Sequence, residues 1–414
     1  MRLFIKHFLL FLFALPINAQ VQEEVNPPDN IKTIIFKGPT DDQFPVIKLG
    51  VPIQLQFDDL TASEQDYYYK IVHCDYDWTP SQLLKSQYLR GTDNQRIINY
   101  ENSFNTLAAY STYRLKIPNK ALSLRVSGNY IIEIYNDINE LQFSRRFVIF
   151  DDLVTVGATS KNARDFNFIN TKQSIQFNIN GGSFQLINPK QEVKVAILQN
   201  YQWSNVITNV PPQFTVGNTL GYKYDAETSF FGGNEFLNFD TSDLRAPTAA
   251  ISRIEYEELY HHYLFTDKYR YDREYTYFPD INGDFVIRTL QGEDPNRESE
   301  YTMIHFSLPL TEEVGLDEVY VYGKFNNYAL EEQNRMTYNE RNGNLEAVIK
   351  LKQGFYNYKY VLKSSDGIID LNAVGGNFHF TENQYLILVY YRNFGDLYDS
   401  IIGIGTTNSE NITN

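Results

Sequence analysis

The sequence predicts an all-β protein built of tandem β-sandwiches, and three observations support this fold class. Short runs alternate apolar and polar side chains, as in YRLKI (113–117) and YIIEIY (130–135). This two-residue period is typical of strands with one face against a core. Tyr and Phe are abundant, with 32 and 29 copies, and both favour strands. Gly, Asn, Asp and Pro interrupt the runs about every ten residues, as in sandwiches.

Seven segments carry the strand signal most clearly. In chain order they cover residues 33–37, 51–57, 67–73, 113–117, 130–135, 174–179 and 192–198. Stretches rich in Ala, Leu and Lys, which would favour helices, are scarce between them.

Residues 1–19 are predicted to be a secretory signal peptide. Arg2 and Lys6 precede an apolar run at residues 8–15, and Ala19 supplies a small residue at the expected cleavage point. The apolar run is too short to span a bilayer as a helix, which needs about 20 residues. We therefore expect an exported mature chain without direct membrane insertion.

The remaining length predicts two or three domains, since a domain usually holds about 100–200 residues. The expected units are residues 31–150, 151–297 and 298–405, followed by a flexible tail at 406–414. A charged run at 292–300 with Pro295 separates the second unit from the third. Similar strands that begin at Gly128 and Gly354 indicate β-domains of similar construction in the first and third units.

Charge and cysteine content exclude several classes of function. The net charge is −15, which disfavours nucleic acid and anionic membrane surfaces as partners because both would repel the chain. A single cysteine, Cys74, excludes an intramolecular disulfide. We expect Cys74 to be buried, as free cysteines usually are.

Residues 71–83 (IVHCDYDWTPSQL) hold the densest group of reactive side chains. A catalytic or metal site is one interpretation of His73, Cys74, Asp75 and Asp77. On a strand, however, His73 and Cys74 point to opposite faces, and a zinc site needs more ligands than this segment offers. We favour a strand end followed by a turn, with Trp78 anchoring the turn against a core.

Residues 280–284 (DINGD) resemble a fragment of a calcium loop, but their spacing departs from the complete pattern. Asn282-Gly283 is interpreted more simply as a tight hairpin turn, because both residues tolerate positive φ. The sequence contains no phosphate-binding loop, nucleophile elbow or zinc-protease motif. We accordingly predict no catalytic, cofactor-binding or metal-binding residue.

The run from residue 256 to 278 is the richest in aromatic side chains. One interpretation is a partner surface, since Tyr is enriched at protein interfaces; the other is ordinary half-covered strands. The candidate partner-interface residues are Trp78, Tyr256, Tyr260, Tyr269, Tyr271 and Tyr275.

Several separately spaced motifs carry a family resemblance. They are YKIVHCDYDW (69–78), YLRG (88–91), NY (99–100), SFNT (103–106), YSTY (110–113), IPN (117–119) and SGNY (127–130). The series resembles the first domain of the plug proteins of the type IX secretion system, over most of residues 31–150. YTYFPDING (275–283) is similar to a later block of the same family.

A second region, VYVYGKFNNY (319–328) with LKQGFYNYKY (351–360), is similar to early-set immunoglobulin-like modules that bind glucans through exposed Trp and Lys. Tyr328 stands where such a module often has Trp. Together the two resemblances imply tandem immunoglobulin-like β-sandwich domains.

The plug resemblance implies a non-enzymatic periplasmic protein. Its partner would be the giant outer-membrane β-barrel of the translocon, whose periplasmic opening it closes when no cargo is loaded. It implies no cofactor and no small-molecule substrate. Two alternatives stay open from the residues: a glycan-binding accessory protein, and an enzyme built around His73, Cys74 and Asp75.

Overall fold

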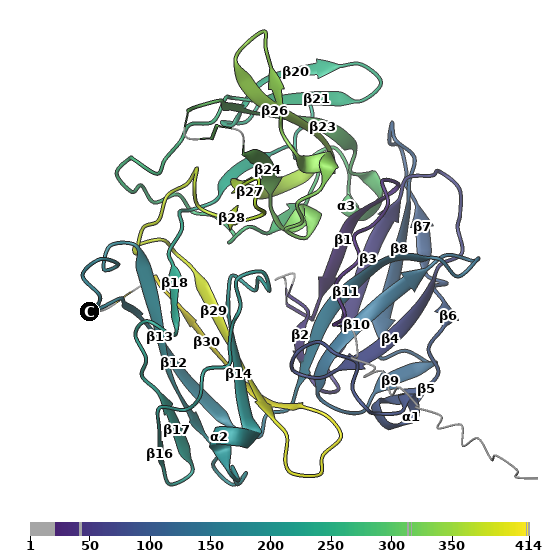
Figure 1. Ribbon diagram of the computed structural model, residues 1–414. Coiled ribbons are helices and arrows are strands. Elements are labelled where there is room, and N and C mark those ends of the chain that lie inside the picture. The colour runs from purple at the N-terminus through teal and green to yellow at the C-terminus, as the bar shows by residue number, and fades with distance from the viewer. Residues whose placement is uncertain (1–20, 41–43, 313, 316, 411, 413–414) are drawn as a thin grey trace, which may run out of the picture.

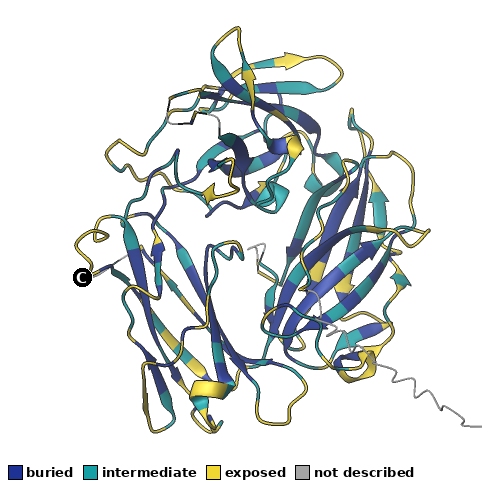
Figure 2. Cartoon of the chain, viewed as in Figure 1, coloured by how far each residue is buried: buried dark blue, intermediate teal, exposed yellow. Residues whose placement is uncertain are grey.

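The computed structural model describes residues 21–40, 44–312, 314–315, 317–410 and 412. Strands dominate these residues and form three two-layered bodies, which surround a common centre in Figure 1. The all-β prediction is confirmed. Figure 2 shows that the buried residues follow the strands, whereas exposed residues gather in the connecting loops.

The first sandwich uses the N-terminal part of the chain. One sheet has the order β1 (Ile31–Lys37), β3 (Ile53–Asp59), β8 (Ser111–Ile117), β7 (Tyr100–Asn102). The other has the order β2 (Val46–Lys48), β11 (Leu141–Phe150), β10 (Gly128–Tyr135), β4 (Tyr68–Cys74), β6 (Gln95–Arg96). The helix α1 (Lys85–Tyr88) precedes a small ladder of β5 (Leu89–Gly91) with β9 (Leu122–Leu124).

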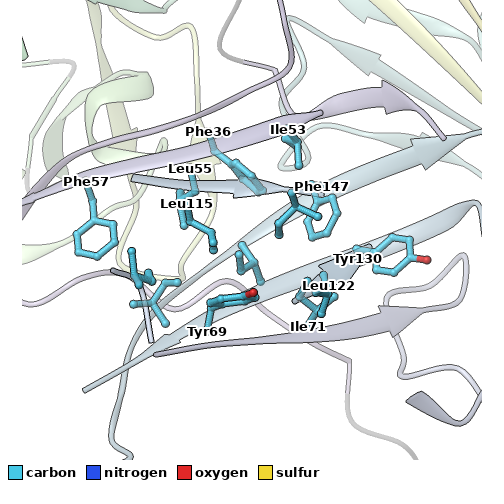
Figure 3. Close-up of a cluster of buried hydrophobic side chains, with 14 of the residues drawn as sticks. Phe36, Ile53, Leu55, Phe57, Tyr69, Ile71, Leu115, Leu122, Tyr130 and Phe147 are labelled. Carbon is cyan, nitrogen blue, oxygen red and sulfur yellow. The ribbon is translucent and has the colours of Figure 1, made fainter. Parts of the chain in front are cut away.

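Alternation along these strands builds the core of the first sandwich. In Figure 3, Phe36 and Phe57 of one sheet face Tyr69 and Ile71 of the other. Phe36 also packs edge-on against Phe147 of β11, with 5.4 Å between ring centroids. Large aromatic rings thus fill the space between the two sheets.

The second sandwich is discontinuous in the chain. Its first sheet has the order β12 (Thr155–Asn162), β13 (Lys172–Asn180), β17 (Thr219–Tyr222), β16 (Phe214–Val216), with β18 (Ser229–Phe231) also on β13. Its second sheet has the order β15 (Ile207–Thr208), β14 (Val193–Gln199), β29 (Gln384–Tyr391), β30 (Ser400–Asn408). The helix α2 (Pro189–Glu192) leads into β14. Teal and yellow strands therefore lie side by side in Figure 1.

The third sandwich is inserted between β18 and β29. One sheet has the order β20 (Ile251–Tyr256), β21 (Tyr260–Leu264), β23 (Tyr301–Pro309), β26 (Asn344–Lys352), β25 (Thr337–Asn339). In the other, β27 (Gly354–Lys363) pairs with β19 (Leu237–Asp240), β22 (Phe285–Ile287), β24 (Glu318–Tyr322) and β28 (Ile369–Asp370). Its short helices are α3 (Pro295–Glu298), η1 (Lys324–Asn326) and η2 (Glu332–Asn334).

The sheets divide the chain differently from the expected units 151–297 and 298–405. Val193 of β14 pairs with Tyr391 of β29, so the last two strands complete the second sandwich. Leu237 of β19 pairs with Tyr358 of β27, so the third sandwich begins well before residue 298. The expected flexible tail at 406–414 is also corrected in part, because β30 continues to Asn408.

The first boundary agrees with its expectation, since β11 ends at Phe150. The predicted signal peptide, residues 1–19, lies outside the described residues. All seven predicted strands are present, as β1, β3, β4, β8, β10, β13 and β14. Asn282 and Gly283 have φ of 54° and 86°, as predicted for a turn. The run before them is not a strand, so the turn does not close a hairpin.

None of the helices among the described residues is long and apolar enough to cross a membrane.

Candidate partner surfaces and interdomain junctions

The segment around His73 is a strand end followed by a turn, as predicted. β4 ends at Cys74, and the Trp78 amide donates to the carbonyl of Asp75 at 3.0 Å. The Asp77 carboxylate closes the turn by accepting the Thr79 hydroxyl at 2.6 Å and the Thr79 amide at 3.1 Å. Asp residues favour turns through bonds of this kind to the backbone two residues on.

His73 and Cys74 lie on opposite faces of β4. The His73 ring packs edge-on against Tyr130 of the first core at a centroid distance of 4.8 Å. Cys74 belongs to a separate buried cluster on the other face. Burial raises the pKa of the Cys74 thiol to about 12 and lowers the pKa of His73 to about 4. The pair therefore has neither the geometry nor the acidity of a thiol nucleophile and its base.

The part of the chain that the structure describes contains no group of three or more His, Cys, Asp or Glu side chains arranged to hold a metal ion.

Trp78 lies in the junction between the first and second sandwiches. It is 6% exposed and packs edge-on against Trp203, with 4.8 Å between ring centroids. The Arg146 guanidinium lies over the Trp78 ring at 4.4 Å. Trp78 thus anchors its turn as predicted, but the surface that it meets belongs to the second sandwich of the same chain.

The first junction is mainly apolar. Side chains from the outer face of the β4–β10–β11 sheet meet those from the β14–β29–β30 sheet. The buried members of this cluster are Cys74, Trp78, Ile131, Val148, Ala196, Leu198, Leu386, Leu388, Tyr390 and Ile401. Two polar contacts also cross this junction: the Tyr390 hydroxyl donates to Asn129 Oδ1 at 2.9 Å, and Arg392 forms an ion pair with Asp75 at 3.2 Å.

The junction of the first sandwich with the third is polar at its centre, where the side chains are fully buried. Lys352 of β26 forms an ion pair with Asp58 of β3 at 2.7 Å, and neither side chain has exposed surface. Asp58 also accepts the hydroxyls of Thr112 at 2.7 Å and Tyr301 at 2.8 Å. The Lys352 ammonium lies 4.0 Å from the centroid of the Tyr110 ring. Nothing in the local sequence pattern marks these residues as partners.

The candidate tyrosines fall into two separate places. Tyr256 and Tyr260 lie at the ends of β20 and β21, where their rings contact each other at 5.0 Å. Tyr256 is 61% exposed and, with Tyr260, lines a groove opposite Phe104 and Leu107 of the first sandwich. The groove lies between the first and third sandwiches. Tyr256 and Tyr260 therefore share it with Phe104 and Leu107, which lie outside the aromatic run 256–278.

The other three candidates lie in the long loop between β21 and β22. Tyr269 is half-buried, and its hydroxyl donates to the carbonyl of Pro309 at 2.9 Å. Tyr271 is exposed. The Tyr275 hydroxyl donates to the buried carboxylate of Glu235, and its ring lies 6.1 Å from that of Phe380.

An exposed aromatic surface surrounds Tyr275. We call it the aromatic patch and define it as the half-buried Tyr275 with the exposed Tyr277 and Phe380; the rings of Tyr275 and Phe380 are neighbours, and Tyr277 donates to Glu382, two residues after Phe380. Phe380 comes from the segment that returns to the second sandwich, about 100 residues later in the chain. The aromatic run at 256–278 predicted the tyrosines of this patch. Phe380 lies outside the run and joins them only in the folded chain.

Tyr328, the residue at the expected glucan platform, is half-buried at the wall of a cavity between domains. Its ring lies 5.1 Å from that of Tyr322, and burial raises the pKa of its hydroxyl well above the usual range. A sugar platform needs an aromatic face open to solvent, which this position does not provide.

Comparison with known proteins identifies the family of the chain. Residues 31–151 match the family model described as the type 9 secretion system plug protein 1st domain. The chain belongs to this plug protein family. These limits coincide with the first sandwich, which carries both junctions described above. The chain therefore has a role in type IX secretion.

One solved structure resembles nearly the whole chain. It is a crystal structure of a hypothetical protein from Parabacteroides merdae, with 31% sequence identity and a TM-score of 0.89. The match covers 93% of this chain and 98% of that protein. The three-sandwich arrangement is thus similar in both. Among the curated proteins, none matches the chain.

Proposed function

We propose that this plug family member is a non-enzymatic periplasmic protein that closes the periplasmic opening of the type IX translocon barrel when no cargo is loaded. The observation that carries the proposal is the family match of the first sandwich. The partner is the giant outer-membrane β-barrel, and cargo entry displaces the plug. No reaction is required, because the task is to occupy an opening and then to leave it.

The two closed junctions support this function physically. A plug has to keep its shape against a wide opening, so its domains must not swing freely. The first sandwich is held to the second by an apolar cluster and to the third by a buried ion pair. Linked domains with small polar interfaces would move relative to one another; these junctions favour a single bulky body.

The aromatic patch is the surface that we propose for contact with the barrel. Tyr and Phe are enriched in interface cores, and a cluster of exposed aromatic side chains is more informative than one exposed ring. The patch is small, with the carboxylate of Glu382 beside Tyr277. A modest interface with a polar rim allows release.

The test is recovery of the barrel in a mild-detergent pull-down from the native envelope, with a tag after Asn414. We expect a very large outer-membrane barrel protein, enriched when cargo is absent. The double variant Tyr277→Ser, Phe380→Ser should reduce this recovery. Phe394→Ser is the matched control, since Phe394 is exposed in the loop between β29 and β30, at the opposite end of β29 from Phe380.

Recovery of the chain without a barrel, or of glycan-processing proteins in its place, would contradict the plug function. If the double variant and the control recover equal amounts of the barrel, the aromatic patch is not the contact surface. The plug function itself would not be contradicted by that result.

A further inference from the structure

Two adjoining cavities lie where the three sandwiches meet. Their volumes are about 80 and 310 Å³, and the larger reaches the size range of small-ligand sites. All three domains contribute: Arg146 comes from the first sandwich, Trp203 from the second and Lys324 from the third. The side chains that line both cavities are Glu24, Pro45, Arg146, Lys324 and Asn327.

The charge at this junction is opposite to that of the whole chain. Five cationic and three anionic side chains line the two cavities together, although the net charge of the protein is −15. Arg145, Arg146 and Lys324 form no ion pair within 4.0 Å among the described residues. Arg145 is buried, and Arg146 and Lys324 are half-buried; charges withdrawn from water in this way are normally paired.

The nearby carboxylates do not neutralise these cations directly. The oxygens of Glu24 accept the backbone amide of Arg146 at 2.7 Å and the side-chain amide of Asn327 at 2.9 Å. Glu24 and Asp284 raise the pKa of Lys324 from a distance, but burial has the larger effect and lowers it. The Lys324 ammonium has no hydrogen-bond acceptor among the described residues.

Aromatic rings form much of the remaining wall of the larger cavity. Phe44 and Tyr201 stack at a centroid distance of 3.5 Å, and Trp203 and Tyr328 border the same space. Two polar atoms there are buried without a partner in the described part of the chain, Nε of Arg146 and the hydroxyl of Tyr328. The cavity thus offers unused donors and cations beside apolar surface.

From this geometry we infer a ligand site: the junction cavity binds a peptide carboxylate attached to an apolar residue. Lys324 and Arg146 receive the carboxylate, and the aromatic walls hold the apolar part. A strongly hydrated inorganic anion fits less well, because the rings offer nothing in place of its water shell. The carboxylate can come from the C-terminus of a peptide or from an acidic side chain, because both present the same carboxylate group to Lys324 and Arg146.

The protein carries its own probe of this site. Its two tryptophans, Trp78 and Trp203, lie 4.4 and 6.0 Å from the Arg146 guanidinium. Intrinsic tryptophan fluorescence of the full chain can therefore follow binding. We would titrate N-acetyl-phenylalanine for a terminal carboxylate and N-acetyl-aspartyl-phenylalanine amide for a side-chain carboxylate. N-acetyl-phenylalanine amide and inorganic phosphate, at equal ionic strength, are the controls.

We expect a saturable change with at least one carboxylate peptide and none with the amide. The response of the two carboxylate probes identifies the source of the group. A response to phosphate alone, or an equal response to the amide, would overturn the inference, as would no saturable change with any probe.

Lys324→Met tests the role of the unpaired cation. We expect it to weaken carboxylate binding at least about tenfold, since charge-assisted hydrogen bonds are lost. Its melting temperature should be equal to or above that of the parent, because a half-buried charge without an ion-pair partner among the described residues is removed. The control is Lys190→Met, an exposed position on α2, which should leave the titration unchanged.

Unaltered binding by Lys324→Met, or a clearly lower melting temperature, would assign Lys324 a structural role and overturn the site. Neither result touches the plug function, because barrel recovery is a separate measurement.

Discussion

The first sandwich meets the second through apolar side chains and the third through a buried ion pair. Trp78, Leu388 and Ile401 belong to the first of these junctions, where a large apolar area leaves water. Asp58 and Lys352 lie at the centre of the other, with every charged oxygen and nitrogen directed at a partner. Both junctions bury their central side chains, but they obtain their stability from different interactions.

The difference shows how one chain can use one junction to hold two domains together and another to set the relative position of two domains. Apolar burial is non-directional and grows with area, so the first junction holds two domains together. A buried ion pair gains little net stability because desolvation opposes it, but breaking it is costly. The hydrogen bonds of Asp58 and Lys352 form in few relative positions of the two domains. We therefore infer that this polar junction fixes the position of the third sandwich relative to the first.

The largest effect is expected from Lys352→Ala, which leaves the Asp58 carboxylate buried without its cation. We expect a loss of about 5 kcal/mol in the free energy of unfolding, the upper end for such pairs, because neither side chain is exposed. Urea unfolding measures it. Lys363→Ala is the control, since the side chains of its ion pair with Glu318 are 39% and 40% exposed and the pair should contribute less than about 1 kcal/mol.

The double variant Asp58→Leu, Lys352→Met sharpens the same point. If the ion pair serves orientation rather than stability, removing both charges should cost less than removing Lys352 alone. A double variant less stable than Lys352→Ala would show that the pair itself stabilises the junction.

Trp78→Ala addresses the apolar junction. We expect a loss of about 3–5 kcal/mol, because a buried indole is removed and a cavity remains beside Trp203. Thermal and urea unfolding both report it. Phe166→Ala, at an exposed loop position, should stay within about 0.5 kcal/mol of the parent. An unchanged melting curve for Trp78→Ala would contradict the packing described for this junction.

His73 predicts a dependence on pH. Burial lowers its folded-state pKa to about 4 from 6.5, so the unfolded chain takes up a proton first as the pH falls. Stability from neutral His73 is complete above pH 6.5 and is lost between 6.5 and 4, by up to about 3 kcal/mol. His73→Gln should reduce the slope of the stability profile in that window without removing it, because burial also lowers the pKa of His262 and of His305 to about 4; an unchanged slope would refute the assignment.

The smallest effect is expected from Tyr390→Phe, which removes one hydroxyl from the apolar junction and leaves Asn129 Oδ1 without its donor. The expected loss is about 1–2 kcal/mol. A double-mutant cycle with Asn129→Ala, followed by urea unfolding, isolates the pair. A coupling energy near zero would mean that the hydroxyl contributes nothing beyond its contact area.

Much of the local structure was predictable because strands and turns leave a short-range signal. The alternation in 67–73 specified which side chains of β4 face the core, and it argued against a catalytic pair of His73 and Cys74 because neighbouring residues of a strand point to opposite faces. The candidate surface was predicted less completely. Tyr256 and Tyr260 came from one run, but their neighbours Phe104 and Leu107 come from the first sandwich. No local pattern connects segments so far apart.

The sequence by itself determined the all-β class, seven of the strands, the turn after Cys74 and the plug family resemblance, because each depends on residues close together in the chain. Only the tertiary structure decided that β29 returns to β14, that Trp78 meets Trp203, and that Lys352 meets Asp58. A strand's alternation records which face is buried but not which partner buries it. Distant partners are selected by the packing of whole sheets, and that selection is made only when the chain folds.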